Sequence, residues 1–269
     1  MSTKTKIGLI AGRGNLPVEV LKEIKAQGKS SVVVAIKGEC PPEVSAMADF
    51  YQEHGLGRLG TIIEVLKKEG IHDLVFAGKV TKEAIFREGF DQLSQGLLAS
   101  LPQKNDDAIL LAVVHELEKN GIIVVKQTDY LQHLLVESGS VLGNVTESEM
   151  ADITLGFKMA KAIGGLDIGQ SVIVKNGVVL AVEAIEGTDQ AIVRGGNLGG
   201  TGSVVVKVSK PAQDERFDVP TIGQNTIESM IKAQAKVLAI EAGKTFFVDK
   251  ADVLKLAAEH QIKIIAGTF

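Results

Sequence analysis

The sequence predicts an α/β fold with two domains. In the first half, apolar stretches of strand length alternate with stretches whose apolar residues recur at helical spacing, which is typical of an open parallel sheet. In the second half, Asn176-Gly177 between two apolar runs indicates a hairpin and hence antiparallel pairing. Small, flexible residues interrupt the alternation at 138–143. We therefore expect a Rossmann-like open parallel sheet in residues 1–137, a linker at 138–143 and an α/β domain with a mixed sheet in residues 144–269.

The first half should be built from βαβ units. Residues 6–11 and 31–36 are predicted strands, and the helix between them begins with Pro17, a residue favoured in a first helical turn. A crossover helix of this kind implies that the two strands are parallel. The other elements expected here are a helix capped by Thr61, a strand at 74–77, a helix at 106–118 and a strand at 122–125.

The second half should mix helices, a hairpin and a buried strand. The valines at 204–208 predict that strand, and apolar residues at helical spacing in 226–242 predict a long helix after it. Five glycines between 195 and 202 predict a pliable loop. The remaining expected elements are a helix at 147–163, hairpin strands at 171–175 and 178–183, a strand at 245–248, a helix at 251–259 and a strand at 262–266.

Composition and charge exclude several classes of protein. The 29 basic and 33 acidic residues give a net charge of −4, and without Lys/Arg blocks the chain is a poor nucleic-acid binder. The start of the chain lacks the apolar core of a signal peptide, and no uncharged run of about 18 residues could span a membrane. We therefore expect a cytoplasmic protein. Cys40 is the only cysteine, so an internal disulfide or a thiolate metal cluster is excluded.

A glycine-containing loop follows the first strand. Gly12-x-Gly14 opens a helix, as in dinucleotide-binding enzymes, but Pro17 stands where the third glycine of that fingerprint belongs. Glu39 follows the second strand, at the place of the acidic residue that binds the ribose in such enzymes. A NAD(P)-linked oxidoreductase therefore stays open as an alternative, beside a tight turn that merely joins strand and helix.

A polar loop at 215–225 lies between the valine strand and a helix start. The exposed N–H groups of a helix start suit phosphate, and Pro220 stiffens the approach. Asp218 is the candidate for the chemistry of this loop, with a simple turn as the alternative. Other acids in loops are Asp106 and Asp107, and then Glu186 and Asp189. Carboxylates in such loops suit Mg²⁺, although helix capping explains Asp106 better and the Glu186–Asp189 group equally well.

Six blocks of sequence, in order, resemble the LpxI-type UDP-2,3-diacylglucosamine pyrophosphatases over nearly the whole chain. The blocks are Ile7-Gly8-Leu9-Ile10-Ala11-Gly12-x-Gly14-x-Leu16-Pro17, Phe76-Ala77-Gly78, Asp106-Asp107-Ala108, Leu166-Asp167-Ile168-Gly169-Gln170, Val182-Glu183-Ala184-x-Glu186-Gly187-Thr188-Asp189 and Asp218-x-Pro220-Thr221-Ile222-Gly223. The chain departs from the family pattern mainly at Gly14-Asn15, in residues 76–80 and in residues 195–202.

The resemblance implies a reaction and a site. Family members use magnesium to hydrolyse the pyrophosphate of UDP-2,3-diacylglucosamine to UMP and 2,3-diacylglucosamine 1-phosphate (lipid X) in lipid A biosynthesis. Water attacks the α-phosphorus, and the reaction occurs between two domains of a homodimer. A non-catalytic UDP-sugar-binding protein is the other alternative. Carried over, the resemblance makes Asp218 the leading catalytic candidate, as a metal ligand or as the base that orients water. Asp189 and Glu186 are the further catalytic candidates, and Asp218 and Asp189 are the expected Mg²⁺ ligands. The substrate-binding candidates are Gly12, Gly14, Asn15, Leu16, Gly78, Lys79, Lys104, Asp107, Gln170, Thr188 and Thr221.

A lipid-linked substrate also requires an apolar surface. An apolar strip between residues 85 and 101 is spaced for one helix face. Its members are Ile85, Phe86, Phe90, Leu93, Leu97, Leu98 and Leu101. The strip could receive acyl chains or contact the inner face of the inner membrane as a peripheral surface. The alternative, slightly favoured, is a stripe that faces the protein core.

Overall fold

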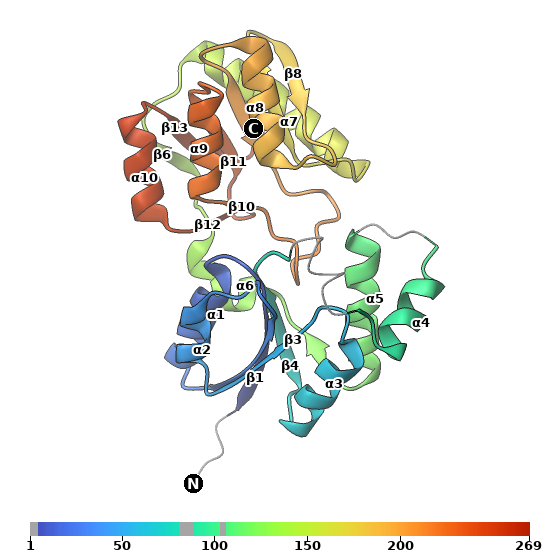
Figure 1. Ribbon diagram of the computed structural model, residues 1–269. Helices are drawn as coiled ribbons and strands as arrows, with labels where there is room; N and C mark the ends of the chain where they lie inside the picture. Colours follow the sequence, from blue (N-terminus) through green and yellow to red (C-terminus); the bar gives the residue numbers. More distant parts are fainter. Residues whose placement is uncertain (1–4, 81–88, 103–105) are drawn as a thin grey trace. The chain divides into compact units, whose positions relative to one another are not determined.

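The chain forms two compact units in the computed structural model (Figure 1). The residues that the structure describes are 5–80, 89–102 and 106–269. The first unit comprises residues 1–132 and 215–217, and the second unit comprises residues 133–214 and 218–269. The three residues 215–217 therefore belong to the first unit, although the chain on both sides of them belongs to the second.

The first unit contains the predicted parallel sheet. Its strands are β1 (Lys6–Ala11), β2 (Ser30–Ile36), β3 (Phe50–His54), β4 (Asp73–Ala77) and β5 (Ile123–Val124). They lie in the order β3-β2-β1-β4-β5, and every neighbouring pair is parallel. These five strands have the order of the doubly wound dinucleotide-binding fold, which confirms a Rossmann-like open sheet. Sequence analysis missed β3, because its residues Phe-Tyr-Gln-Glu-His include only two that are apolar.

Helices cover the sheet of the first unit. They are α1 (Leu16–Ala26), α2 (Pro42–Met47), α3 (Leu59–Lys68), α4 (Gln92–Ser100), α5 (Asp106–Lys119) and α6 (Thr128–Leu131). Residues of α3 and α5, such as Leu66 and Leu117, share a buried cluster with Val32 of β2 and Leu74 of β4. The prediction that Thr61 caps α3 is wrong: the helix begins earlier, because the buried Leu59 already belongs to its apolar face.

Part of the apolar strip between residues 85 and 101 faces the core. Leu93 and Leu97 of α4 pack against the cluster formed by α3, α5 and the sheet. For these two residues the core-facing interpretation is therefore confirmed. Ile85 and Phe86 lie outside the described residues. Within the part of the chain that the structure describes, no helix is long and apolar enough to cross a membrane.

The second unit contains a mixed sheet, as predicted. Its strands are β6 (Gly139–Leu142), β7 (Ser171–Lys175), β8 (Val178–Val182), β9 (Val204–Lys207), β11 (Val237–Glu241) and β13 (Lys263–Gly267). They lie in the order β6-β13-β11-β9-β7-β8. Strands β9, β11 and β13 are parallel, whereas β6, β7 and β8 pair antiparallel with their neighbours. A separate two-stranded parallel sheet joins β10 (Thr221–Ile222) and β12 (Phe246–Phe247).

The long helix predicted at 226–242 is wrong in its second half. Helix α9 (Gln224–Lys232) ends early, and the chain turns at Gln234, whose φ is 53°, before β11 begins at Val237. The run Val-Leu-Ala-Ile is buried on both faces of the sheet, so it shows no alternation that would distinguish a central strand from a helix. In the folded chain these residues pair in parallel with β9 and β13, and they therefore form a strand rather than a continuation of the helix.

The pliable loop predicted from the glycines is also wrong. Gly195, Gly196 and Gly199 lie inside α8 (Thr188–Gly199). A Cβ atom at Gly195 would lie 2.7 Å from the side chain of Ile173, and one at Gly196 would lie 2.5 Å from Ala233. These glycines therefore let α8 approach β7 and the end of α9 closely, and their role is packing rather than flexibility.

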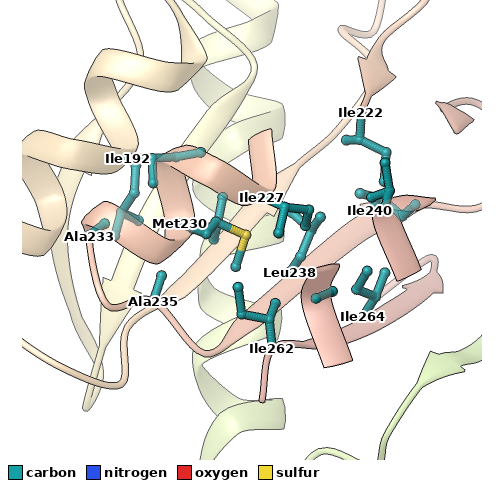
Figure 2. Packing of buried hydrophobic residues seen from close by; sticks show 14 of the residues in the cluster. Ile192, Ile222, Ile227, Met230, Ala233, Ala235, Leu238, Ile240, Ile262 and Ile264 are labelled. Carbon is teal, nitrogen blue, oxygen red and sulfur yellow. The ribbon is translucent and has the colours of Figure 1, made fainter. Parts of the chain in front are cut away.

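Helices cover both faces of this sheet. Helices α8, α9 and α10 (Lys250–Glu259) supply one buried cluster with the sheet. Figure 2 shows how Ile192 of α8 and Ile227 and Met230 of α9 lie with Leu238 of β11 in that cluster. The opposite face is covered by α7 (Glu147–Gly165), whose Ile153 and Phe157 pack with valines of β7 and β9. Helix α7 begins with a capping box formed by Thr146 and Glu149.

The predicted hairpin at Asn176-Gly177 is confirmed. Both residues have positive φ, 51° and 76°, as a type I′ turn requires, and the turn joins β7 to β8. The buried carboxylate of Asp152 in α7 accepts hydrogen bonds from the N–H groups of Asn176 (2.8 Å) and Gly177 (2.6 Å). Helix α7 is thereby linked to the hairpin.

Asp152→Ala should destabilise the protein, because it removes a buried acceptor that serves two backbone donors. We expect the free energy of unfolding to fall by about 2 kcal/mol, the range for hydrogen bonds to a charged group. Urea denaturation followed by circular dichroism would measure the loss. Glu147→Ala, at an exposed position in the first turn of the same helix, is the matched control and should cost less. Equal stability of Asp152→Ala and the wild type would contradict this role for the carboxylate.

Candidate active site

The two glycine-containing loops of the first unit lie side by side at the carboxyl ends of β1 and β4. The backbone N–H of Gly12 donates to the carbonyl of Ala77 (2.9 Å), and Arg13 and Lys79 exchange two backbone hydrogen bonds (2.7 and 2.9 Å). Strands β1 and β4 are the neighbours at which the strand order reverses. Open parallel sheets bind ligands at this point, so the two loops lie where a ligand site is expected in such a fold.

Close backbone contact explains the glycines of these loops. A Cβ atom at Gly12 would lie 2.5 Å from the carbonyl oxygen of Lys79, and one at Gly78, which has a φ of 92°, would lie 2.7 Å from the carbonyl carbon of Gly12. Gly14 has a φ of 94°, and the chain then enters α1 through Asn15 and Leu16. The loops thus present main-chain groups and a helix N-terminus, an arrangement that suits an anionic ligand.

Glu39 occupies the expected position after β2. Its side chain is fully buried, and its carboxylate lies 3.2 Å from Nε of Arg13 in the first glycine loop. In dinucleotide-binding enzymes an acidic residue at this place binds a ribose hydroxyl. Here the carboxylate contacts a guanidinium of the same unit, so Glu39 holds the glycine loop in addition to any contact with a ligand.

In the second unit, two of the predicted substrate-binding residues contact a buried lysine, and a third, Gln170, is linked to them through Glu183. Nζ of Lys207, the last residue of β9, lies 3.3 Å from Oγ1 of Thr188 and 3.1 Å from the carbonyl oxygen of Thr221. Thr188 donates a hydrogen bond to Glu183 (2.9 Å), which also accepts one from the backbone N–H of Gln170 (3.3 Å). We call this group the Lys207 cluster: Gln170, Ser171, Glu183, Thr188, Lys207 and Thr221.

Asp218 belongs to a second polar group in the same unit. Its carboxylate lies 3.8 Å from Nζ of Lys210 and accepts a hydrogen bond from the side chain of Gln213. Lys210 also binds Asp167 (2.7 Å), and its backbone N–H donates to Gln213 (2.9 Å). Lys210 and Gln213 thus orient the carboxylate of Asp218. The side chain of Asp218 is 38% exposed, so the carboxylate still reaches the surface.

The other predicted catalytic acids lie around the start of α8. Glu186 forms an ion pair with Arg194, and the hydrogen bond from that guanidinium lowers the pKa of the carboxyl. Asp189 lies in the first turn of α8, where a negative charge is favourable. In the first unit Asp107 lies in the first turn of α5, whereas Lys104 and the side chain of Asp106 are outside the described residues.

Sequence analysis missed Lys207, Lys210 and Gln213. The sequence contains a signal for Lys207. This lysine lies within the run Val-Val-Val-Lys-Val, so it is buried if the strand is buried. Buried charged residues are uncommon unless they have a partner or a function. Lys210 and Gln213 lie in the loop after β9 and follow no pattern in sequence that would connect them to Asp218. Only the folded loop shows the connection.

Comparison with known proteins decides the family. The model of the LpxI N-terminal domain matches residues 6–134, and the model of the LpxI C-terminal domain matches residues 137–265. The chain belongs to the LpxI family. A curated member, the UDP-2,3-diacylglucosamine pyrophosphatase LpxI of Caulobacter vibrioides, is 35% identical over 265 residues, which cover 94% of each chain.

Solved structures of other families resemble this LpxI chain only weakly. The biotin carboxylase subunit of a pyruvate carboxylase is 15% identical, with a TM-score of 0.28, over 63% of this chain and 34% of that one. The urea carboxylase of Kluyveromyces lactis is 18% identical, with a TM-score of 0.30, over 64% of this chain and 12% of that one. The chain thus spans about a third or less of these proteins, and at such scores the likeness carries no argument.

The carboxylate of Asp218 is compatible with a magnesium ion only where other ligands hold most of the ion. Among residues 5–80, 89–102 and 106–269, no group of three or more His, Cys, Asp or Glu side chains is close enough to hold a metal ion. Mg²⁺ does not need such a cage, since it usually takes one or two carboxylates together with waters and substrate phosphates. The partly exposed carboxylate of Asp218 is a suitable donor of this kind.

Gly12→Ala should disrupt the pair of glycine loops, because its methyl group would collide with backbone rather than with a movable side chain. We expect a melting temperature lowered by several degrees, the consequence of about 1–3 kcal/mol of strain, and weakened binding of UMP by calorimetry. Gly96→Ala is the matched control, since a Cβ atom at Gly96 in α4 meets no atom within 4 Å. That variant should be as stable as the wild type or slightly more stable. Unchanged stability and UMP binding in Gly12→Ala would contradict the packing argument.

Proposed function

We propose that this chain hydrolyses the pyrophosphate bond of UDP-2,3-diacylglucosamine to UMP and 2,3-diacylglucosamine 1-phosphate, as a step of lipid A biosynthesis. The observation that carries the proposal is membership of the LpxI family along almost the whole chain, together with 35% identity to a curated UDP-2,3-diacylglucosamine pyrophosphatase. The polar groups of the second unit are chemically suited to such a reaction, because phosphoryl transfer depends on positioning and on charge stabilisation.

Asp218 is the proposed catalytic carboxylate. In its ionised form it would orient the water that attacks the α-phosphorus and accept a proton from it, and the oxygen bridging the two phosphorus atoms would leave with the lipid phosphate. Lys210 and Gln213 would act as positioning residues, since both contact the carboxylate of Asp218. Magnesium, when bound, would neutralise charge on the phosphate oxygens, and we propose Asp218 and Asp189 as its protein ligands. Glu186, which is paired with Arg194, is proposed only as a further acid near the start of α8.

Substrate binding is proposed for residues of the glycine loops and of the Lys207 cluster. The proposed residues are Gly12, Gly14, Asn15, Leu16, Gly78, Lys79, Lys104, Asp107, Gln170, Thr188 and Thr221. A homodimer and a peripheral contact with the inner membrane complete the proposal, and both rest on the family resemblance and on the lipid-linked substrate. Light scattering would test the dimer, and sedimentation with anionic vesicles would test the membrane contact.

The decisive experiment is release of UMP from UDP-2,3-diacylglucosamine, with and without EDTA. Asp218→Ala should fold normally, because the side chain lies in a partly exposed loop, and should lose about a hundredfold or more in turnover, the typical cost of removing one element that stabilises the transition state. Asp189→Ala tests the second proposed ligand. Asp252→Ala, at an exposed acid of α10, is the matched control and should keep full activity.

Each alternative predicts a different result. If the wild type bound the nucleotide sugar but released no UMP with Mg²⁺ present, the protein would be a binding module. Thermal stabilisation by NAD(P), without UMP release, would favour the oxidoreductase. Near-normal turnover in Asp218→Ala, with the wild type active, would overturn the role of Asp218 while leaving the proposed reaction intact.

A further inference from the structure

An ion pair at the carboxyl end of β11 holds the chain shortly after β9. Glu241 is the last residue of β11, and Lys161 lies in α7. Nζ of Lys161 lies 2.8 and 2.6 Å from the two carboxylate oxygens of Glu241. The same ammonium group donates to the carbonyl of Ser209 (2.7 Å), and the carboxylate accepts a hydrogen bond from the backbone N–H of Ser209 (2.8 Å). The Lys161–Glu241 pair therefore binds both main-chain groups of Ser209.

Ser209 lies where the chain leaves the sheet. Strand β9 ends at Lys207, and Ser209 is buried. Buried main-chain N–H and C=O groups need hydrogen-bond partners once the ladder of the strand has ended. Neutral side chains would satisfy them, yet both partners here are charged groups, which form the stronger hydrogen bonds. The side chains of Lys161 and Glu241 are only 30% and 12% exposed, so the pair holds Ser209 in a partly desolvated environment.

Two sets of contacts connect Ser209 to the carboxylate of Asp218. The next residue, Lys210, places its Nζ 3.8 Å from that carboxylate. The backbone of Lys210 also binds Gln213 twice: its N–H donates to the side-chain oxygen of Gln213 (2.9 Å), and its carbonyl accepts from the backbone N–H of Gln213 (3.1 Å). The side-chain amide of Gln213 in turn donates to the carboxylate of Asp218. A shift of Ser209 would therefore reach both side chains that orient this carboxylate.

The end of α7 lies against Lys210 as well. A Cβ atom at Gly164 would lie 3.3 Å from Cα of Lys210. Asp167, which follows the helix and has a φ of 55°, forms an ion pair with Nζ of Lys210 (2.7 Å). Helix α7 thus contacts Ser209 through the side chain of Lys161 and approaches Lys210 through Gly164. The chain that leads to Asp218 is therefore supported at two successive residues.

We propose that Lys161 and Glu241 are positioning residues for the reaction at Asp218, an inference that rests on the proposed function. The pair fixes Ser209, which fixes the backbone of Lys210 and, through it, Gln213. These two residues then orient the carboxylate that directs the attacking water. A small misplacement of a catalytic group costs a large part of the rate, because the geometry of attack is restrictive. Since the pair acts on that geometry, its loss should lower kcat and leave KM nearly unchanged.

Lys161→Met tests the inference, because it removes the ammonium group and keeps most of the apolar side chain. The kcat for UMP release should fall about tenfold, whereas KM for UDP-2,3-diacylglucosamine should stay within about twofold of the wild type. Lys161→Arg, which keeps the charge and the donors, should recover most of the lost turnover. Hydrogen exchange measured by mass spectrometry should be faster in residues 210–218 of Lys161→Met. If this variant does not fold, Glu241→Gln replaces it, with the same expected results.

Lys263→Met is the matched control. Lys263 begins β13, and its Nζ lies 2.9 and 2.8 Å from the carboxylate oxygens of Glu149, which is also in α7. Its side chain is 30% exposed, as is that of Lys161. Because β13 is parallel to β11, Lys263 lies at the opposite end of the strands from Glu241. Lys263→Met should therefore lower the melting temperature about as much as Lys161→Met, but leave kcat and the exchange of residues 210–218 unchanged.

A double variant tests whether Lys161 acts through Asp218. In an Asp218→Ala background the carboxylate that the pair positions is absent. Adding Lys161→Met should then lower the residual kcat by less than about twofold, because residues that act through one group are not additive. A further tenfold loss in the double variant would overturn the inference, since Lys161 would then affect the reaction independently of Asp218.

The outcomes separate this inference from the proposed function. With an active wild type, normal kcat in a folded Lys161→Met or Glu241→Gln variant would overturn the positioning role and leave the proposed reaction intact. An equal loss of kcat in Lys263→Met would also overturn it, because it would show a general effect of breaking an ion pair of α7. A wild type that releases no UMP would refute the proposed reaction. Hydrogen exchange would then decide separately whether the pair orders residues 210–218, and unchanged exchange would refute that ordering.

Discussion

Parallel pairing of β9 with β11 is the constraint on which the second unit depends. Parallel neighbours require a crossover between them, and α9 provides it. The end of β9 and the start of α9 therefore lie at the same edge of the sheet, which brings Lys207 to Thr221. The first unit obeys the same rule, since parallel pairing of β1 with β4 brings Gly12 to Gly78. In both units, topology rather than local sequence gathers the candidate binding groups.

Asp218 follows a segment that is anchored in the first unit. Glu215 pairs with Lys126 (2.8 Å), and Phe217 packs against the apolar cluster of that unit. The backbone N–H of Asp218 then donates to the carbonyl of Asp214 (3.0 Å), and Pro220 restricts the chain on the other side. Backbone restraint before and after the carboxylate, together with its contact to Gln213, reduces the conformational entropy that must be lost to position it.

Sequence patterns predicted best the elements whose turn chemistry is specific. The hairpin at Asn176-Gly177 was predictable because a type I′ turn needs positive φ at both residues. Strand β11 was not, because Val237 to Ile240 are buried on both faces and periodicity cannot distinguish such a strand from a helix. The sequence blocks shared with the family identified Thr188 and Asp218 as candidate site residues. Lys207 was missed because it lies in a run of valines, which was interpreted only as a buried strand.

The second unit holds two polar groups that differ in exposure. Around Asp218 the ammonium group of Lys210 lies near the carboxylates of Asp167 and Asp218, and the side chain of Asp218 is partly exposed. Around Lys207 the side chains of Thr188 and Glu183 are linked by hydrogen bonds, and the lysine is buried. Water screens the charges of the first group more than those of the second. The buried ammonium group therefore depends on its fixed neighbours for stabilisation more than the exposed carboxylate does.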